Sequence, residues 1–230
     1  MPSGALKALC RGALISLALL TPLVGNAAPV IYDNGGPNQA SGNNMSFAYQ
    51  AEDFVLASAF TVTDVHFWSL EASNAYRNGF YWALQSNAVG TPGAVVASGF
   101  QSTVTRTATG VSAFGDSEFL NDFNIAPTVL AAGTYWLTLH NGAFSNLTDD
   151  GLDFLWETTA VAKGFNGHED FGDGFGWNPN GNEHAFRLTG TPVGGPTVPE
   201  PGTAWLAGVA LAGLLVRRLR SGRASHSSVG

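Results

Sequence analysis

The chain is poor in cysteine and in basic residues. Its one cysteine, Cys10, lies near the N-terminus, so the rest of the chain has neither disulfide bonds nor thiolate metal ligands. Residues 28–201 contain four basic side chains against 17 acidic ones, a formal net charge of −13. A surface of this sign repels nucleic acid and anionic lipid, so we expect no nucleic-acid partner. Because residues 28–201 have no cysteine, their stability must come from core packing.

Helical patterning is also scarce in residues 28–201. No stretch sustains a hydrophobic period of 3.6 residues, whereas β-branched and aromatic runs alternate with turns rich in Gly, Asn and Thr. A parallel β-helix is the alternative to a sandwich, but the sequence shows no fixed repeat. We therefore predict an all-β domain, an antiparallel β-sandwich that is jelly-roll-like. The candidate strands are residues 30–32, 46–55, 61–70, 80–85, 95–106, 119–125, 134–140, 154–157 and 184–189.

Alternation inside two candidate strands predicts which side chains share a face. In residues 80–85, one face carries Phe80, Trp82 and Leu84. In residues 134–140, one face carries Tyr135, Leu137 and Leu139, and the other carries Trp136, Thr138 and His140. Aromatic side chains in strands are usually buried, so we expect four tryptophans in or near the core: Trp68, Trp82, Trp136 and Trp156.

The N-terminus has the pattern of a helical secretory signal peptide. Lys7 and Arg11 precede an apolar run at residues 13–24, and small residues follow at 25–27. We predict cleavage after Ala27, which implies the Sec machinery and signal peptidase as partners. An uncleaved membrane anchor is the alternative, but the run is short and a cleavage site follows it. Cys10 precedes the run, so it is not placed for lipidation.

The C-terminus combines three features in a fixed order. A Pro-Glu-Pro motif is followed by an apolar run at residues 203–216 and then by arginines. The run is short for a bilayer span, and a soluble core helix is the alternative. However, it is apolar all round and is followed at once by basic residues, as expected at a membrane. The residues that carry this pattern are Val198, Pro199, Glu200, Pro201, Arg217, Arg218 and Arg220.

This arrangement resembles the PEP-CTERM sorting signal of Gram-negative bacteria that make exopolysaccharide. The resemblance covers residues 198–223, and the polar tail at 224–230 is longer than is typical. It implies that an exosortase cuts near the Pro-Glu-Pro motif. The protein would then be exported, held transiently at the inner membrane by a short hydrophobic transmembrane helix, and passed to the cell surface or beyond. Residues 132–137 more loosely resemble segments of other exported PEP-CTERM proteins.

These features divide the chain into four parts. Residues 1–27 form the signal peptide and 28–191 the β-sandwich domain. Residues 192–201 form a Pro/Gly linker with the motif, and 202–230 form the hydrophobic segment and basic tail. Residues 164–182, dense in Gly, Asn and Asp, are predicted to form a long loop, which makes them candidates for function.

Two kinds of site are predicted, calcium and carbohydrate, and each includes residues of this loop; a second acidic cluster for calcium lies at residues 149–153. Carboxylates in short acidic loops suit Ca²⁺, although neither cluster has EF-hand spacing. The candidate calcium ligands are Asp149, Asp150, Asp153, Glu169, Asp170 and Asp173. Sugar sites combine an aromatic platform with amides and carboxylates. The candidate carbohydrate-binding residues are Trp177, Asn178, Asn180 and Glu183.

Enzymatic and ice-binding functions are less favoured. The histidines of residues 28–201 are scattered along the sequence, and no zinc-binding, nucleophile-elbow or phosphate-loop motif occurs there. A carboxylate pair such as Asp149 and Asp153 leaves a secreted polysaccharide hydrolase as the alternative function. Alternating threonines at 103, 105, 107 and 109 could line one strand face, but ice binding needs several such ranks. We therefore expect a non-catalytic surface or matrix protein that binds exopolysaccharide, with calcium as its one candidate cofactor.

Overall fold

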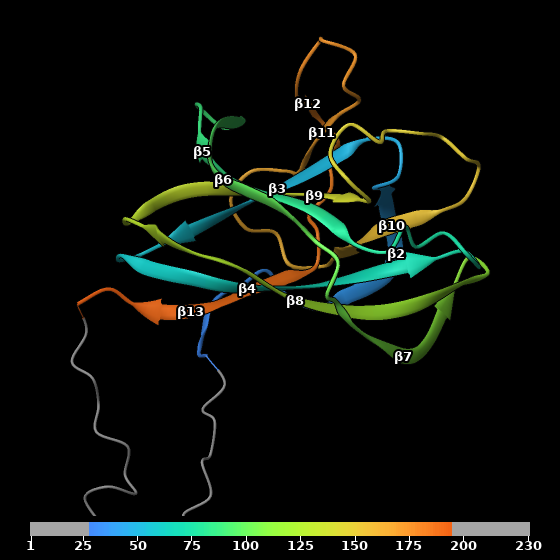
Figure 1. The fold of residues 1–230 in the computed structure, drawn as a ribbon, viewed down its shortest axis with the longest axis horizontal. Helices are drawn as coiled ribbons and strands as arrows, with labels where there is room; N and C mark the ends of the chain where they lie inside the picture. The colour runs from blue at the N-terminus through green and yellow to red at the C-terminus, as the bar shows by residue number, and fades with distance from the viewer. Residues whose placement is uncertain (1–27, 195–230) are drawn as a thin grey trace, which may run out of the picture.

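The computed structural model describes residues 28–194, which form thirteen β-strands in two stacked sheets (Figure 1). Every paired strand in both sheets is antiparallel. This confirms the prediction of an all-β, antiparallel, sandwich-like domain, while the jelly-roll connectivity stays a prediction. The described residues contain no helix of the length and apolarity that a membrane span requires. The predicted signal peptide and C-terminal hydrophobic helix lie outside the described residues.

The first sheet is built around β4, which pairs with other strands along both of its edges. One edge of β4 pairs with β8 along its whole length, and the other edge is shared by β13 and β10. Strand β7 extends the sheet beyond β8, β1 extends it beyond β13, and β2 extends it beyond β10. Its strands are β1 (Val30–Asp33), β2 (Pro37–Asn44), β4 (Phe60–Glu71), β7 (Thr105–Ala113), β8 (Asp116–Leu130), β10 (Phe154–Thr159) and β13 (Phe186–Pro192).

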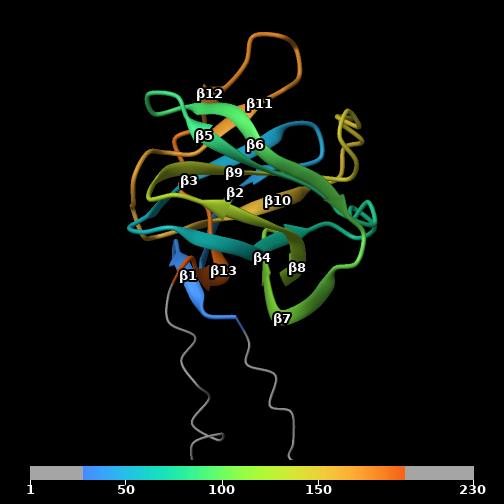
Figure 2. The same ribbon diagram turned by 60° about the vertical axis from the view of Figure 1, so that its left-hand side comes forward.

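The second sheet lies over the first in the order β12-β11-β3-β9-β5-β6. Strands β3, β9 and β5 form its centre, and β6 and the two-residue β12 form its edges. Figure 2 shows the two layers from the side, with β5 and β6 over β4 and β8. Its strands are β3 (Tyr49–Leu56), β5 (Phe80–Asn87), β6 (Pro92–Gln101), β9 (Gly133–Asn141), β11 (His168–Asp170) and β12 (Asn178–Pro179).

The core fills the space between the two sheets. The side chains predicted to share one face in β5 and in β9 do so, and both faces point into the core: Phe80, Trp82, Leu84, Leu137 and Leu139 are buried in it, and Tyr135 is partly buried. Phe67 of the first sheet meets Phe80 of the second edge-on, with ring centroids 4.9 Å apart. Each fully buried aromatic or aliphatic side chain of this kind contributes about 1.5–3 kcal/mol relative to an exposed one. Because residues 28–194 contain no cysteine, this burial of apolar side chains is the main source of their stability.

The tryptophans of the strands divide into three environments. Trp82 and Trp156 are buried between the sheets. Trp136 faces outward from the second sheet but is fully buried, because Phe165 stacks on it and His168 packs against it. Trp68 is half-buried on the first sheet, under the guanidinium of Arg187.

Several strands differ from the sequence prediction. Strand β2 was not predicted, because its sequence PNQASGNN lacks hydrophobic alternation and its conformation is fixed by pairing with β10. Residues 95–106 were expected to form one strand, but β6 ends at Gln101 and β7 begins at Thr105. The expected long loop at 164–182 contains β11 and β12, and β13 extends to Pro192.

Both ends of the described chain lie at the first sheet. Strands β1 and β13 pair with each other, and both leave the body on the same side (Figures 1 and 2). The outer face of the second sheet lies on the opposite side of the sandwich.

Candidate functional site

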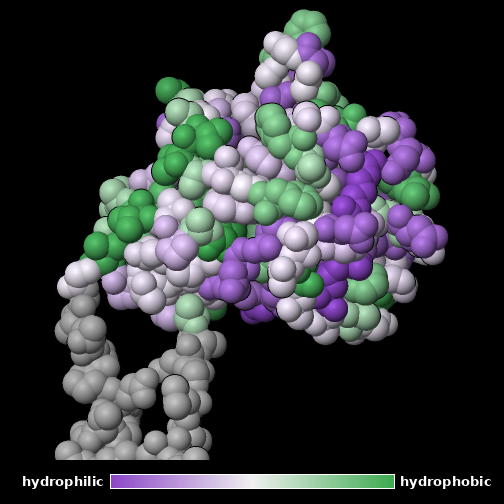
Figure 3. Space-filling view, in the orientation of Figure 1, coloured by the Kyte–Doolittle hydropathy of each residue, from purple (hydrophilic) through white to green (hydrophobic). Residues whose placement is uncertain are grey.

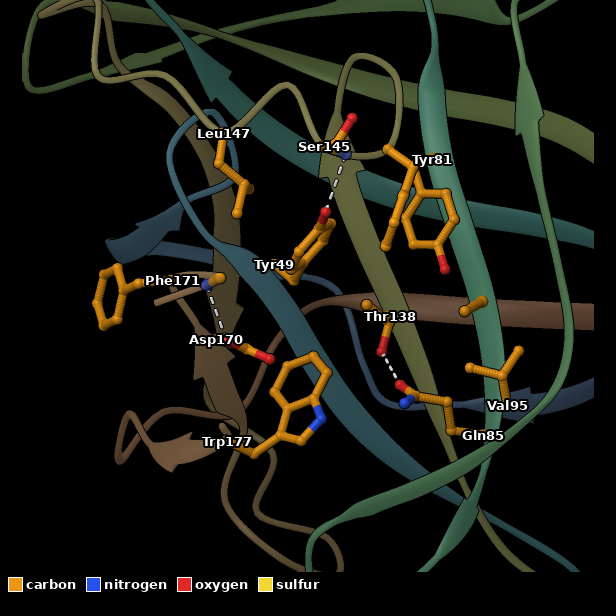
Figure 4. A pocket seen from close by; sticks show the side chains of 13 residues that line it. Tyr49, Tyr81, Gln85, Val95, Thr138, Ser145, Leu147, Asp170, Phe171 and Trp177 are labelled. Atoms are coloured by element: carbon orange, nitrogen blue, oxygen red, sulfur yellow. Dashed lines mark hydrogen bonds between the residues drawn. The ribbon is translucent and has the colours of Figure 1, made fainter. Parts of the chain in front are cut away.

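The outer face of the second sheet carries a cleft of about 630 Å³ (Figure 4). Its floor comes from β3, β5, β6 and β9, and its walls come from the loop after β9 and the loop between β11 and β12. The lining residues are mainly aromatic and polar: Tyr49, Tyr81, Ala83, Gln85, Val95, Thr138, Phe144, Ser145, Leu147, Asp170, Phe171, Gly172 and Trp177.

Strand alternation places the floor. Tyr81, Ala83 and Gln85 alternate with the core residues of β5, so they point outward into the cleft. Thr138 of β9 lies opposite Ala83 and donates its hydroxyl hydrogen to Gln85 Oε1. Gln85 Nε2 in turn donates to the Gly93 carbonyl at 3.1 Å. The floor is therefore held by hydrogen bonds between neighbouring strands.

A cluster of three aromatic rings joins the floor to the loop after β9. The ring of Tyr49 lies 5.7 Å from that of Tyr81 and 5.4 Å from that of Phe144, centroid to centroid. Tyr81 and Phe144 are 4.9 Å apart. The backbone N–H of Ser145 donates to Tyr49 Oη at 3.0 Å, so the Tyr49 hydroxyl hydrogen can itself be donated. Burial raises the pKa of both tyrosines, so both are neutral donors near neutral pH.

The opposite wall comes from β11 and the loop that follows it. Trp177 and Asp170 stand across the cleft from Tyr81 and Gln85 (Figure 4). Asp170 Oδ1 accepts the backbone N–H of Gly172 at 2.8 Å, which fixes the carboxylate. Phe171 stacks on Phe47 with ring centroids 5.9 Å apart. The cleft therefore presents an indole and a carboxylate facing a phenol and an amide.

In the aromatic loop, residues 171–177, glycine alternates with Phe171, Asp173, Phe175 and Trp177. Its glycines, Gly172, Gly174 and Gly176, have φ values of 68°, 88° and 79°, a left-handed conformation that favours glycine. A Cβ at Gly172 would lie 2.5 Å from Leu147 Cδ1, so this glycine also lets the loop pack closely. Phe175 is 88% exposed in this loop, which stands clear of the body in Figure 3.

Of the predicted carbohydrate-binding residues, only Trp177 lines the cleft. Asn178 follows it in β12 and donates to the Gly176 carbonyl at 3.0 Å. Asn180 donates to Gln50 Oε1 at 3.1 Å, and Glu183 accepts from Asn34 at 3.4 Å. These last two side chains belong to a hydrogen-bonded network outside the cleft.

The predicted calcium ligands are spread over several places. Asp170 lines the cleft, whereas Glu169 accepts from Gln50 and Asp173 from the backbone of Phe175. Asp150 forms an ion pair with Arg77 at 2.7 Å. The two remaining carboxylates accept nearby hydrogen bonds: Asp149 from Gly151 and Asp153 from Asn44. Within residues 28–194, no three His, Cys, Asp or Glu side chains are grouped to hold a metal ion, so calcium stays an unsupported prediction.

Sequence reasoning missed most of the cleft. Tyr81, Gln85 and Thr138 lie on strand faces opposite to predicted core faces, and that alternation is the signal that could have found them. Alternation within β5 and β9 does not show that Trp177 and Asp170 face these strands across one cleft. The sequence predicted Trp177 for the carbohydrate site and Asp170 for the calcium site. Tyr49 and Phe144 carry no pattern of their own in the sequence.

A buried pair of Glu52 and His184 lies behind the cleft and is separate from it. Glu52 Oε2 lies 2.8 Å from both the backbone nitrogen and Nδ1 of His184, and both side chains are fully buried. His184 Nε2 lies 3.1 Å from Asn43 Oδ1, which also accepts from Asn182. Because Asn43 Oδ1 is an acceptor, Nε2 carries a hydrogen, and one further proton joins Nδ1 to Oε2.

Burial determines where that proton resides. Desolvation raises the pKa of Glu52 to about 9 and lowers that of His184 to about 3. The pair is thus a neutral carboxylic acid that donates to a neutral imidazole, and it holds β3 against the segment before β13. Because both groups are fully buried, the pair stabilises the fold and does not reach a ligand.

Two buried carboxyl groups, those of Glu118 and Glu157, hold β2 to the first sheet. The backbone N–H of Gln39 donates to Glu157 Oε1, and its side-chain Nε2 donates to Glu118 Oε2, both at 2.8 Å. Burial and the neighbouring Glu118 raise the pKa of Glu157 to about 8. These carboxyls are buried and lie outside the cleft.

The alternating threonines lie at an edge of the first sheet. Thr105, Thr107 and Thr109 are exposed on β7, and Thr103 precedes that strand. The β8 residues paired with Thr105 and Thr107 are Asp122 and Leu120, so the threonine rank does not continue into the neighbouring strand. Ice binding gains no support from this arrangement.

The comparison with known families concerns the C-terminus. The PEP-CTERM protein-sorting motif matches residues 197–221, which contain every sorting residue predicted above. The chain carries a PEP-CTERM sorting motif. This PEP-CTERM protein is therefore an exported protein with an exosortase as its processing partner. The matched segment lies outside the described residues. A comparison with curated proteins finds no match.

Proposed function

We propose that this PEP-CTERM protein is a non-catalytic component of the cell surface or extracellular matrix that binds exopolysaccharide in its cleft. The observation that carries the proposal is that Trp177 and Asp170 face Tyr81 across one cleft on the second sheet. The sorting motif supports the location, since exported proteins of this kind meet the polysaccharide outside the cell.

The chemistry of the cleft suits a sugar ring. The C–H faces of a pyranose are apolar and pack on the flat faces of aromatic rings such as Trp177, while its edge hydroxyls need donors and acceptors. Asp170 supplies a fixed acceptor, and the Tyr49 hydroxyl supplies a donor. Aromatic contact and hydrogen bonding therefore meet at the scale of one or two sugar units.

The carboxylate inventory favours binding over hydrolysis. Glycosidases that use two carboxyl groups hold them on either side of the scissile bond. The cleft is lined by one carboxylate, Asp170. The predicted pair Asp149 and Asp153 lies outside it, with Asp153 bound to Asn44. A hydrolase acting on the polysaccharide remains the alternative, and an assay for new reducing ends during incubation with polysaccharide tests it.

The positions of β1 and β13 relative to the cleft support a role in binding polysaccharide at the cell surface. Strands β1 and β13, at the two ends of the described residues, lie in the first sheet, while the cleft lies on the outer face of the second. A chain held transiently by its C-terminal apolar segment would thus present the cleft away from the membrane. After exosortase processing, the same face would remain open to the matrix.

The experiment that tests the proposal replaces Trp177 with alanine and measures polysaccharide binding by affinity gel electrophoresis. Loss of one aromatic platform costs about 1.4 kcal/mol, so we expect the affinity to fall about tenfold. Phe114→Ala is the matched control, because Phe114 is an exposed aromatic residue outside the cleft. Unchanged binding by Trp177→Ala would show that this cleft is not the binding site.

A further inference from the structure

We infer that the cleft selects uncharged polysaccharide chains and rejects acidic ones. The inference rests on the proposed binding function and adds the charge class of the ligand. It comes from the side chains that line the cleft and from the charges that surround it.

The cleft contains a negative charge and no positive one. Asp170 is the one lining residue with an acidic side chain, and no lining residue is basic. Proteins that recognise carboxylate or sulfate groups use arginine or lysine, whose N–H groups form charge-assisted hydrogen bonds with the anion. Without such a residue, a uronic acid in this cleft would lose its hydration and gain no counter-charge.

The basic residues of the described chain are all engaged elsewhere. Arg77 pairs with Asp150 and donates to three backbone carbonyls, and Arg106 pairs with Glu71 between the rings of Tyr76 and Phe119. Lys163 donates to the Asp33 carbonyl, and Arg187 lies over the Trp68 ring. None of these four side chains lines the cleft.

The net charge of the domain around the cleft is also negative. Residues 28–194 contain 16 acidic and four basic residues. Two further acidic residues lie close to Asp170 in the chain: Glu169 precedes it in β11, and Asp173 lies in the aromatic loop. An acidic polysaccharide carries a charge on every sugar or every second sugar, so its repulsion accumulates along the chain at low ionic strength. The repulsion weakens when salt shortens the Debye length from about 30 Å at 0.01 M to about 8 Å at physiological strength.

The polar groups of the cleft match hydroxyls instead. Asp170 uses Oδ1 to accept from Gly172, which leaves Oδ2 to accept from a sugar hydroxyl. The Tyr49 hydroxyl accepts from Ser145 and keeps its own hydrogen to donate. The indole N–H of Trp177 is a further donor at the half-buried wall. An uncharged sugar supplies both partners for these groups without an ionic cost.

The experiment compares a neutral glucan, dextran, with polygalacturonate and alginate, using the purified exported protein at about 0.01 M and about 0.15 M salt. We expect dextran to bind at least about tenfold more tightly than either acidic polymer at low salt, with little salt dependence. Binding of the acidic polymers should rise as salt is added, because screening removes repulsion.

Asp170→Asn removes the charge of the cleft at nearly constant size. We expect this variant to bind polygalacturonate several-fold more tightly at low salt, while its affinity for dextran falls by a few-fold at most. Asp149→Asn is the matched control, because Asp149 caps the N–H two residues ahead as Asp170 does but lies outside the cleft.

Two outcomes would overturn the inference, and they differ from each other. If the acidic polymers bind as tightly as dextran at low salt and Trp177→Ala weakens them, the cleft binds polysaccharide but does not select by charge. If neither the neutral nor the acidic polymers bind, the proposed function fails together with the inference.

Discussion

Glu52 and His184 are the residues at which burial and hydrogen bonding are most tightly coupled. Neither side chain is exposed, and Glu52 Oε2 contacts two nitrogens of His184 at 2.8 Å. An acid and an imidazole in contact at the protein surface would form an ion pair. Here the low dielectric of the interior favours the neutral forms, which is why the two pKa values shift in opposite directions.

Substitutions at Glu52 should separate loss of the hydrogen bonds from loss of the proton. Glu52→Ala leaves the backbone N–H and Nδ1 of His184 unpaired beside a cavity, and we expect it to lower the free energy of unfolding by about 2–5 kcal/mol. Glu52→Gln keeps an oxygen that accepts from His184. It should cost only about 1 kcal/mol, because His184 must change tautomer and lose its donation to Asn43.

Urea denaturation at neutral pH measures both variants. Trp68→Phe is a suitable control for general disturbance, since Trp68 is half-buried on the other sheet. Equal losses for the two Glu52 variants would contradict the role given to the hydrogen bonds.

The aromatic loop shows how an element depends on residues that carry no chemistry. Gly172 and Gly174 both have left-handed φ values, but a Cβ would meet Leu147 at the first position and open space at the second. Leu147 lines the cleft together with Trp177. The loop and the cleft wall are thus joined through one close contact.

Alanine at each of the two glycines tests this contact. Both Gly172→Ala and Gly174→Ala should destabilise the fold by about 1–2 kcal/mol, because alanine is strained at positive φ. We expect Gly172→Ala alone to displace Leu147 and lower polysaccharide affinity several-fold. Leu147 methyl shifts by NMR, read together with binding, provide the measurement. Equal effects of both variants on the methyl shifts would argue against the contact.

Strands differ in how well their own residues predict them. Strand β5 alternates large apolar and outward-facing residues, so its inner face follows from the sequence. Strand β2 has no such pattern, and it exists because β10 offers backbone partners and Gln39 bridges two buried carboxyls. Local alternation reports burial on one face, whereas backbone pairing requires a partner that is distant in the chain.

The whole domain should lose stability as the pH rises from about 7 to about 9. Burial raises the pKa of Glu183 to about 7, of Glu157 to about 8 and of Glu52 to about 9. In this window the folded state holds protons that the unfolded state, with ordinary carboxyl pKa values, has already released. Each raised carboxyl therefore stabilises the fold less as the pH climbs through its folded pKa.

The histidines do not oppose this trend above neutrality. Burial lowers the pKa of His140, His168 and His184, so above their ordinary value of 6.5 they are neutral in both states and add no slope. Calorimetry across this pH range should show a falling melting temperature, and Glu52→Gln should flatten the upper part of the decline. A flat or rising profile in the wild type would show that the buried carboxyls are ionised in the folded state.

Composition and local pattern were enough for several conclusions about this molecule. Scarce helical pattern and alternating apolar residues predicted two-sided strands, and the order of motif, apolar run and arginines predicted the sorting signal that matches residues 197–221. These are properties of neighbouring residues, which local sequence specifies. The cleft is different, because Tyr49, Tyr81, Asp170 and Trp177 come from three separate segments: β3, β5, and β11 with its following loop. Their meeting depends on which strands pair and how the loops cross the sheet, and long-range packing sets both.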